Sequence, residues 1–123
     1  MADYVYLNVN PDKKRISDCV TRAITLTTGI PYSKVRKMLF HTAKLLGCEK
    51  LCVMCYKFLI EDVLKCRRVN CDGMYPNDFA NLNNNGIYLL RMNGHICSCI
   101  DGKIYDIFDS RYYDFLTDAW KVE

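Results

Sequence analysis

The stretch "RISDCVTRAITLTTGIP", residues 15 to 31, carries the signals of one complete helix and is the starting point for the fold. Ser17 is predicted as the N-cap, and the helix is expected to end near Thr28 with Gly29 at the C′ position. Its inner stripe repeats at helical spacing and consists of Val20, Ala23, Ile24 and Thr27. Cys19 falls in the first turn, next to the positive end of the helix dipole. That position raises the question of whether its thiol is reactive or simply buried.

More helical segments follow in the first half of the chain. A second helix is predicted from Ser33 to just before Gly47, because apolar residues recur there on one helical face. Residues 56 to 68 form a third, less regular helical segment. Residues 75 to 86 are rich in turn-forming side chains, with room for one helical turn at their centre.

The second half of the chain has the pattern of a sheet. Strands are predicted at residues 86–92, 94–100 and 103–108, separated by the hairpin dipeptides "NG" and "DG". Residues 4–10 form a further short strand, and 119–122 close the sheet. Helices followed by strands indicate an α+β fold, with N-terminal helices packed on a C-terminal antiparallel sheet of three to five strands. The length predicts a single domain over residues 1–123.

Composition and charge exclude several classes of protein. No apolar run reaches the 18 residues of a transmembrane helix, and the first residues lack the order of a signal peptide. We therefore expect a cytoplasmic protein without membrane contact. The net charge of +3 is too small to argue for nucleic acid, which makes a nucleic-acid partner unlikely. The basic residues between 13 and 37 are most simply a solvated surface.

Eight cysteines are many for 123 residues, and in a cytoplasmic protein they are expected to be reduced. Zinc remains an alternative, because two pairs could act as knuckles, with Cys48 beside them: Cys52 with Cys55, and Cys66 with Cys71. The segment between the pairs has a helical rather than a loop-like pattern. Ordinary thiols are therefore favoured, and we expect no metal or cofactor. Cys97 and Cys99 share a strand face with His95 and are expected to pack against helices.

His95 opens a predicted strand, whereas the other histidine, His41, lies on the second helix in a packing or partly exposed position. The register of the following hairpin decides which acid His95 meets. A three-residue turn places His95 opposite Asp109. A two-residue turn places it opposite Phe108, with Asp106 as the diagonal neighbour on the same face.

Together these residues predict a nucleophile, a base and an orienting acid. A helix N-terminus lowers the pKa of a thiol, and a neighbouring imidazole lowers it further by forming an ion pair. The predicted triad is Cys19, His95 and Asp109, with Asp106 as the competing third member. The backbone amides at the helix start would form part of an oxyanion hole.

Two segments of the chain, "SDCVTRAITLTTGIPYSKV" and "NGHICSCIDGKIYDIFDSR", support a family resemblance. Their order and spacing resemble the papain-like cysteine peptidase superfamily, and more narrowly small phage-encoded cysteine peptidase-like proteins. The resemblance implies Cys19 as nucleophile, His95 as general base and Asp109 as the orienting residue. It also implies the host cytoplasm as the location of a phage-encoded protein.

The resemblance is incomplete at the oxyanion hole. Papain-like enzymes usually place a glutamine six residues before the cysteine, and here that position is Lys13. Asn8 or Asn10 could replace it. The leading expectation is a thiol-dependent hydrolase of the peptidase, isopeptidase or deamidase type, acting on a protein or peptide. The alternative is a catalytically inactive papain-like phage protein that binds and inhibits a host factor.

Overall fold

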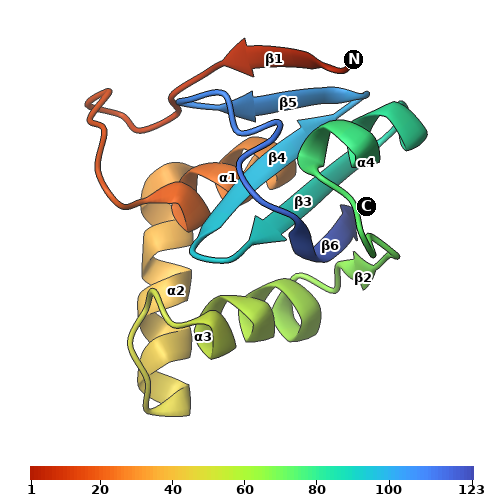
Figure 1. Ribbon diagram of the computed structural model, residues 1–123. Coiled ribbons are helices and arrows are strands. Elements are labelled where there is room, and N and C mark those ends of the chain that lie inside the picture. The colour runs from red at the N-terminus through yellow and green to blue at the C-terminus, as the bar shows by residue number, and fades with distance from the viewer.

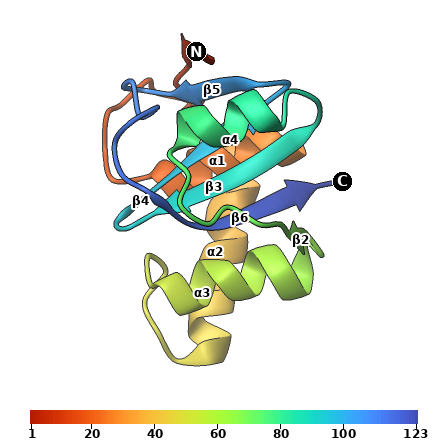
Figure 2. The ribbon, with the colours of Figure 1, turned by 45° about the vertical axis from the view of Figure 1, so that its right-hand side comes forward.

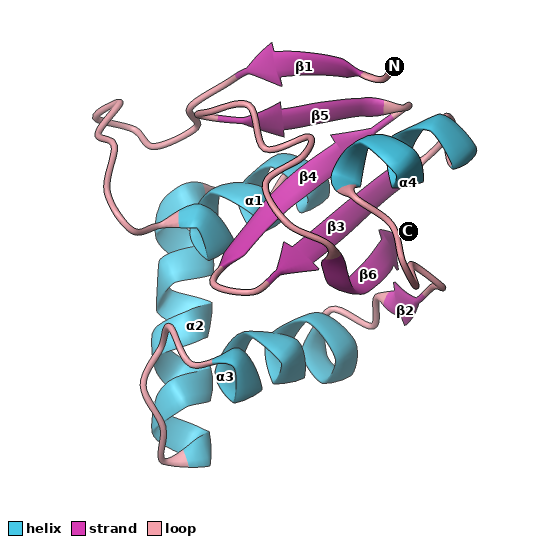
Figure 3. Ribbon diagram, viewed as in Figure 1, coloured by secondary structure: helices cyan, strands magenta, loops and turns pink.

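The computed structural model describes residues 1–123 as an α+β fold with four α-helices and one six-stranded mixed sheet (Figures 1 and 3). The helices are α1 (Cys19–Thr28), α2 (Tyr32–Leu46), α3 (Val53–Phe58), which continues into the π-helical turn η1 (Leu59–Val63), and α4 (Pro76–Leu82). The strands are β1 (Asp3–Tyr6), β2 (Arg67–Arg68), β3 (Ile87–Met92), β4 (His95–Ile100), β5 (Lys103–Asp106) and β6 (Leu116–Val122). The strand order in the sheet is β1-β5-β4-β3-β6-β2. The predicted α+β class is therefore confirmed.

Helices cover both faces of this sheet, as Figures 1 and 2 show, and each face has its own apolar core. The helices α1, α2 and α3 lie on one face, and the short α4 lies on the other. Neighbouring residues of β3 point to opposite faces, so Leu89 joins the α1–α3 core and Leu90 joins the α4 core. Both leucines are fully buried, which explains why β3 lacks the polar alternation of a half-exposed strand.

Helix α1 ends where the sequence predicts, and its predicted inner stripe is buried. Gly29 ends the helix in the left-handed conformation with a φ of 76°, and its amide donates to the Thr25 carbonyl. The N-cap is Asp18 rather than the predicted Ser17, and its side chain makes no capping hydrogen bond. That carboxylate is instead held by Arg22. An ion pair four residues apart on the same helix thus replaces the expected cap.

The sheet differs from the expected antiparallel one at its first edge. Strand β1 is shorter than residues 4–10 and pairs in parallel with β5, with Tyr4 opposite Ile104. Parallel pairing needs a long crossover, which the helices between these two strands provide. The C-terminal strand was expected to close the sheet, but β6 lies inside it, between β3 and the two-residue β2.

The turn between β4 and β5 sets the register next to the site. Asp101 and Gly102 both have positive φ, 49° and 77°, as a two-residue type I′ turn requires. Ile100 therefore pairs with Lys103. Of the two registers that the sequence left open, this is the one with the shorter turn.

The third predicted helix, residues 56–68, is displaced. Helix α3 begins earlier, at Val53, and η1 ends at Val63, so that Arg67 and Arg68 form β2 against β6. Pairing with a strand distant in sequence overrides the helical pattern here. No helix in the chain combines the length and the apolar character needed to cross a bilayer.

Candidate active site

The site lies where the start of α1 meets the start of β4. Cys19 is the first residue of α1 and is half-buried, and His95 is the first residue of β4 and is 8% exposed. Cys19 and His95 line the same cleft, and each side chain shifts the pKa of the other. The structure therefore brings together the predicted nucleophile and the predicted base.

The carboxylate that holds His95 is Asp106, the last residue of β5. His95 Nε2 and Asp106 Oδ2 are 2.6 Å apart, and Asp106 is only 3% exposed. Since Nε2 is engaged by Asp106, Nδ1 is the ring nitrogen that remains for the Cys19 thiol. The His95 ring also packs against Phe108, with ring centroids 4.8 Å apart. Both neighbours agree with the two-residue turn.

Asp109, the predicted third member, does not contact His95. It is exposed and forms a two-pronged ion pair with Arg111, with distances of 2.9 Å and 2.7 Å. This guanidinium lowers the pKa of Asp109. The acid that contacts His95 is therefore Asp106, the competing candidate of the sequence analysis, and not the predicted Asp109. The reason is the turn length, because one more turn residue would have shifted β5 by one position.

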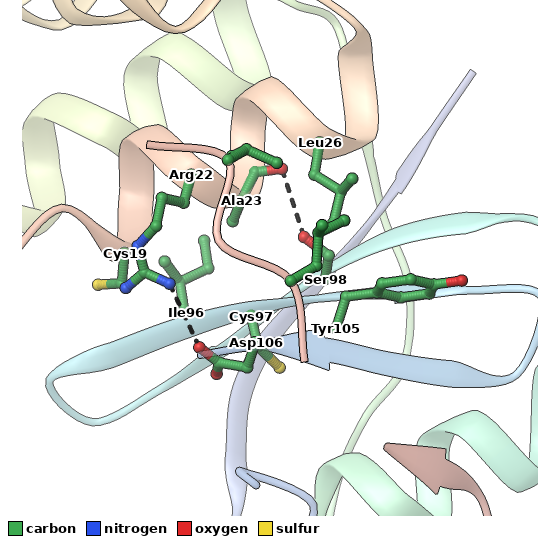
Figure 4. A pocket seen from close by; sticks show the side chains of 11 residues that line it. Cys19, Arg22, Ala23, Leu26, Ile96, Cys97, Ser98, Tyr105 and Asp106 are labelled. Carbon is green, nitrogen blue, oxygen red and sulfur yellow. Dashed lines mark hydrogen bonds and ion pairs between the residues drawn. The ribbon is translucent and has the colours of Figure 1, made fainter. Parts of the chain in front are cut away.

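A buried arginine connects the helix to this carboxylate, and the sequence reasoning missed it. Arg22 Nε is 2.6 Å from Asp18 Oδ1. Arg22 Nη1 is 3.5 Å from Asp106 Oδ1, a contact drawn in Figure 4. Ser110 Oγ donates to Asp106 Oδ2 over 2.7 Å, and the amide of Ile107 donates to Oδ1 over 2.8 Å. The four-residue spacing of Asp18 and Arg22 on one helix face was a signal that could have revealed this pair.

These contacts stabilise charged forms of both reacting groups. Burial opposes protonation of His95, but the hydrogen bonds to Asp106 and Cys19 outweigh it and raise its pKa to about 9. Burial likewise opposes ionisation of Cys19, but the hydrogen bond and charge of His95, with the Ile96 amide, lower its pKa. The arrangement therefore favours a thiolate beside an imidazolium.

The other thiols differ from Cys19. Burial raises the pKa of each of these cysteines: Cys48, Cys55, Cys66, Cys71, Cys97 and Cys99. Cys97 and Cys99 pack in the α4 core, in keeping with the expectation that they contact a helix. No group of three or more histidine, cysteine or acidic side chains has an arrangement that could hold a metal ion. His41 is exposed on α2, away from the site.

A cleft opens in front of Cys19 and His95, with a volume of about 350 Å³. Its lining includes Ile16 from the segment before α1, Leu51 and Val53 at the start of α3, and Gly94 and Phe108 from the sheet side. A second, much smaller cavity of about 10 Å³ lies behind Cys19, beside Arg22 and Asp106 (Figure 4). The larger cleft has room for part of a polypeptide substrate, whereas the smaller one holds no more than a water.

Neither asparagine that could complete an oxyanion hole is free to do so. The side-chain amide of Asn8 donates to the Lys14 carbonyl, and that of Asn10 donates to Asp18 and to Tyr32. Lys13 Nζ donates to the Asn8 carbonyl. The donors that remain are at the start of α1, where no side chain caps the helix and the first backbone amides have no partner within it. They lie next to Cys19, where an oxyanion would form.

Comparisons with known proteins give no further assignment. No protein-family model matches the chain, and neither the curated proteins nor the solved structures contain a significant match.

Proposed function

We propose that this protein is a thiol-dependent hydrolase with a papain-like fold, in which Cys19 is the nucleophile and His95 the general base. Asp106 takes the role of the orienting carboxylate. The observation that carries this proposal is the chain of contacts from Cys19 through His95 to Asp106, with 2.6 Å between the imidazole and the carboxylate. The lowered pKa of Cys19, against burial that opposes it, supports the same role.

The chemistry follows from these positions. The Cys19 thiolate attacks a carbonyl carbon, forming a carbon–sulfur bond while the carbonyl π electrons move to oxygen. The first amides of α1 stabilise this oxyanion. His95 then donates its proton to the departing amine as the carbon–nitrogen bond breaks. Water next attacks the thioester carbon and loses a proton to His95. The carbon–sulfur bond then breaks and its electron pair returns to sulfur, which releases the acid and restores the Cys19 thiolate beside protonated His95.

Asp106 keeps His95 in the orientation and charge state that these steps need. Its Oδ2 binds Nε2, so that Nδ1 points the transferable proton toward Cys19. Arg22 is a positioning residue, because it contacts Asp106 rather than the reacting atoms. Peptidases, isopeptidases and deamidases share these steps, and the proposal covers all three.

The test is the rate at which iodoacetamide alkylates Cys19 between pH 5 and pH 9, read by peptide mass spectrometry. A free thiol with a pKa of about 8.5 is ionised to roughly 0.3% at pH 6. An ion-paired Cys19 is expected to react about 10–100-fold faster than Cys48 at that pH, since burial raises the pKa of Cys48. His95→Ala should abolish this advantage.

The matched control is Leu82→Ala, which truncates an exposed side chain at the end of α4, on the other face of the sheet. Labelling of Cys19 should be unchanged in this variant. If Cys19 reacts no faster than Cys48 in the wild type, or if His95→Ala has no effect, the hydrolase proposal is wrong.

A second candidate function follows from Asn8 and Asn10, whose side chains already form hydrogen bonds elsewhere and do not complete an oxyanion hole. The Asn8 side chain donates to Lys14, and that of Asn10 donates to Asp18 and Tyr32. No glutamine precedes Cys19. We propose as the alternative an inactive papain-like protein of phage origin that binds and inhibits a host factor. Expression of wild type and Cys19→Ala in a bacterial host separates the two. A hydrolase loses its effect on growth in the variant, and a binding protein keeps it.

A further inference from the structure

The cleft at Cys19 is one end of a longer depression that runs over the start of α2. A neighbouring hollow of about 390 Å³ shares three lining residues with the cleft: Ile16, Ser17 and Leu51. A further hollow of about 330 Å³ shares three lining residues with that one: Ser33, Arg36 and Lys50. We call these two hollows together the basic groove. The basic groove connects the cleft at Cys19 to the surface of α2, which contains none of the proposed catalytic residues.

The far end of the basic groove is positively charged and contains no carboxylate. It is lined by Ser33, Arg36, Lys37, Phe40, His41 and Lys50, all of them exposed. No ion pair with an acid of the chain is formed by any of three of these residues: Arg36, Lys37 and Lys50. Their charges are therefore available to a ligand.

The middle of the groove is positive as well. Lys14 lines it, and of its two acids, Asp18 is already held by Arg22 and by the Tyr32 hydroxyl. Asp12 is the other acid there. Residues 1–50 contain nine of the 17 lysines and arginines but only four of the 14 acidic residues. The positive charge of the chain is thus concentrated on the part that forms the groove.

We propose that the basic groove binds an acidic segment of the polypeptide whose carbonyl Cys19 attacks. This inference rests on the proposed hydrolase function and names its substrate class. The substrate would place its scissile amide in the apolar cleft and its aspartate or glutamate side chains along Arg36, Lys37 and Lys50. Complementary charge of this kind speeds encounter and fixes the register of the bound chain.

A polypeptide fits this groove better than a nucleic acid does. Surfaces that bind single strands interleave basic residues with several aromatic rings on which bases stack. At the far end of this groove, Phe40 is the one aromatic side chain besides the His41 imidazole. Continuity with the cleft also favours a ligand that carries an amide, because Cys19 has no equivalent target in a nucleic acid.

The experiment measures binding separately from catalysis. A fluorescein-labelled ten-residue peptide of alternating glutamate and serine is titrated with the Cys19→Ala protein and followed by fluorescence anisotropy. A peptide with glutamine in place of glutamate is the neutral reference. We expect the acidic peptide to bind more tightly than the neutral one, and its affinity to fall as salt rises from 50 to 500 mM, because salt screens exposed charges.

Charge reversal locates the site. Arg36→Glu with Lys50→Glu should weaken binding of the acidic peptide by about tenfold, since two attractive contacts become repulsive. The matched control is Lys65→Glu with Lys103→Glu, two exposed lysines outside the groove without ion pairs, which changes the net charge equally. This control should leave the affinity within about twofold.

Three results would overturn the inference: equal binding of the acidic and neutral peptides, equal weakening by both double variants, or tighter binding of a ten-residue oligothymidylate than of the acidic peptide. The labelling of Cys19 in the wild type stays a separate measurement. Fast labelling without peptide binding refutes the groove alone. If Cys19 is labelled slowly but the acidic peptide binds in a way that depends on Arg36 and Lys50, the hydrolase proposal is wrong. The groove is then a binding site for acidic segments without catalysis.

Discussion

Two buried aspartates in the same sheet differ in the side chains that they contact. Asp106, at the end of β5, is 3% exposed, and Asp118, on β6, is 7% exposed. Asp106 contacts a histidine, a serine hydroxyl, a backbone amide and one arginine. Asp118 contacts cations only: Arg91 at 2.6 Å, Lys57 at 3.8 Å, and Arg68.

The partners decide what each carboxylate can do. Arginine and lysine keep their charge at all ordinary pH values, so the Asp118 cluster ties β6 to β3 and β2 in one state. His95 can gain or lose a proton within the ordinary pH range, with a pKa raised to about 9, and Cys19 contributes to that shift. Asp106 therefore contacts a side chain that titrates, whereas Asp118 contacts side chains that stay charged and link neighbouring strands. The predictions below separate these two roles, from the largest expected effect to the smallest.

Asp118→Ala is expected to cost the most stability and to leave the thiol unchanged. Removing the carboxylate leaves the largely buried Arg91 without its partner, which should lower the free energy of unfolding by about 3 kcal/mol. Urea denaturation measures this loss. In urea-free buffer, Cys19 should be alkylated at the wild-type rate. A slowed Cys19 would mean that the two clusters are coupled.

Asp106→Asn should show the reverse pattern. The amide keeps the size of the side chain but loses the charge that, with the hydrogen bond, raises the pKa of His95 to about 9. A lower His95 pKa destabilises the ion pair, so alkylation of Cys19 at pH 6 should fall about tenfold, one pKa unit being a factor of ten. Mass-spectrometric labelling measures it. A rate equal to that of wild type would contradict the role of Asp106.

The pH dependence of stability is the third test, with Cys19→Ser as the variant. Serine does not ionise in this range, so His95 remains as the titrating group of the pair. Because folding raises the pKa of His95, its contribution is complete below about pH 6.5 and is lost as the pH rises through the folded value. A pKa raised from 6.5 to about 9 corresponds to about 3 kcal/mol, and Cys19→Ser removes the part of this shift that Cys19 causes. The free energy of unfolding should therefore drop by about 1–3 kcal/mol between pH 6.5 and pH 9.5.

In the wild type this alkaline loss should be smaller. Folding lowers the pKa of Cys19, so its contribution is present at high pH and is lost as the pH falls through the folded value. The two slopes oppose each other between the two ordinary pKa values. Folding also lowers the pKa of Asp118, whose contribution is lost only when the pH falls toward that of an ordinary carboxyl group. A Cys19→Ser profile that is flat up to pH 9.5 would contradict the His95–Asp106 pair.

Ser110→Ala is expected to have a smaller effect. Ser110 is fully buried and donates to Asp106, so its loss should cost about 1 kcal/mol of stability and slow Cys19 labelling about twofold. Ser98→Ala is the matched control, because Ser98 is equally buried but its hydroxyl donates to the Ala23 carbonyl. Slower labelling in the control would show a general packing effect instead.

Asp109→Asn should change almost nothing. Asp109 is exposed and paired with Arg111, and such surface pairs contribute roughly 0–1 kcal/mol. Cys19 should label at the wild-type rate. A loss as large as that of Asp106→Asn would show that the hairpin adopts the longer turn in solution, with Asp109 opposite His95.

The sequence predicted the parts of the fold that depend on local pattern. The inner stripe of α1, its end at Gly29 and the hairpin strands that follow all came from residues a few positions apart. The same local signals placed Cys19 at a helix start and His95 at a strand start. The parallel edge strand β1 and the internal position of β6 could not be read in this way, because strand pairing depends on contacts far apart in the chain.

By itself, then, the sequence determined the helices on a sheet, the place of Cys19 at a helix start and a short list of acids for His95. Only the tertiary structure identifies Asp106 as the acid beside His95. Ile100 pairs with Lys103 in the sheet, so the turn is two residues long, with positive φ at both Asp101 and Gly102. It also placed Arg22 between Asp18 and Asp106, and it joined the cleft to the basic groove along α2. Helix and turn signals are local, whereas the choice among several acids depends on a register of one residue that only the packed sheet enforces.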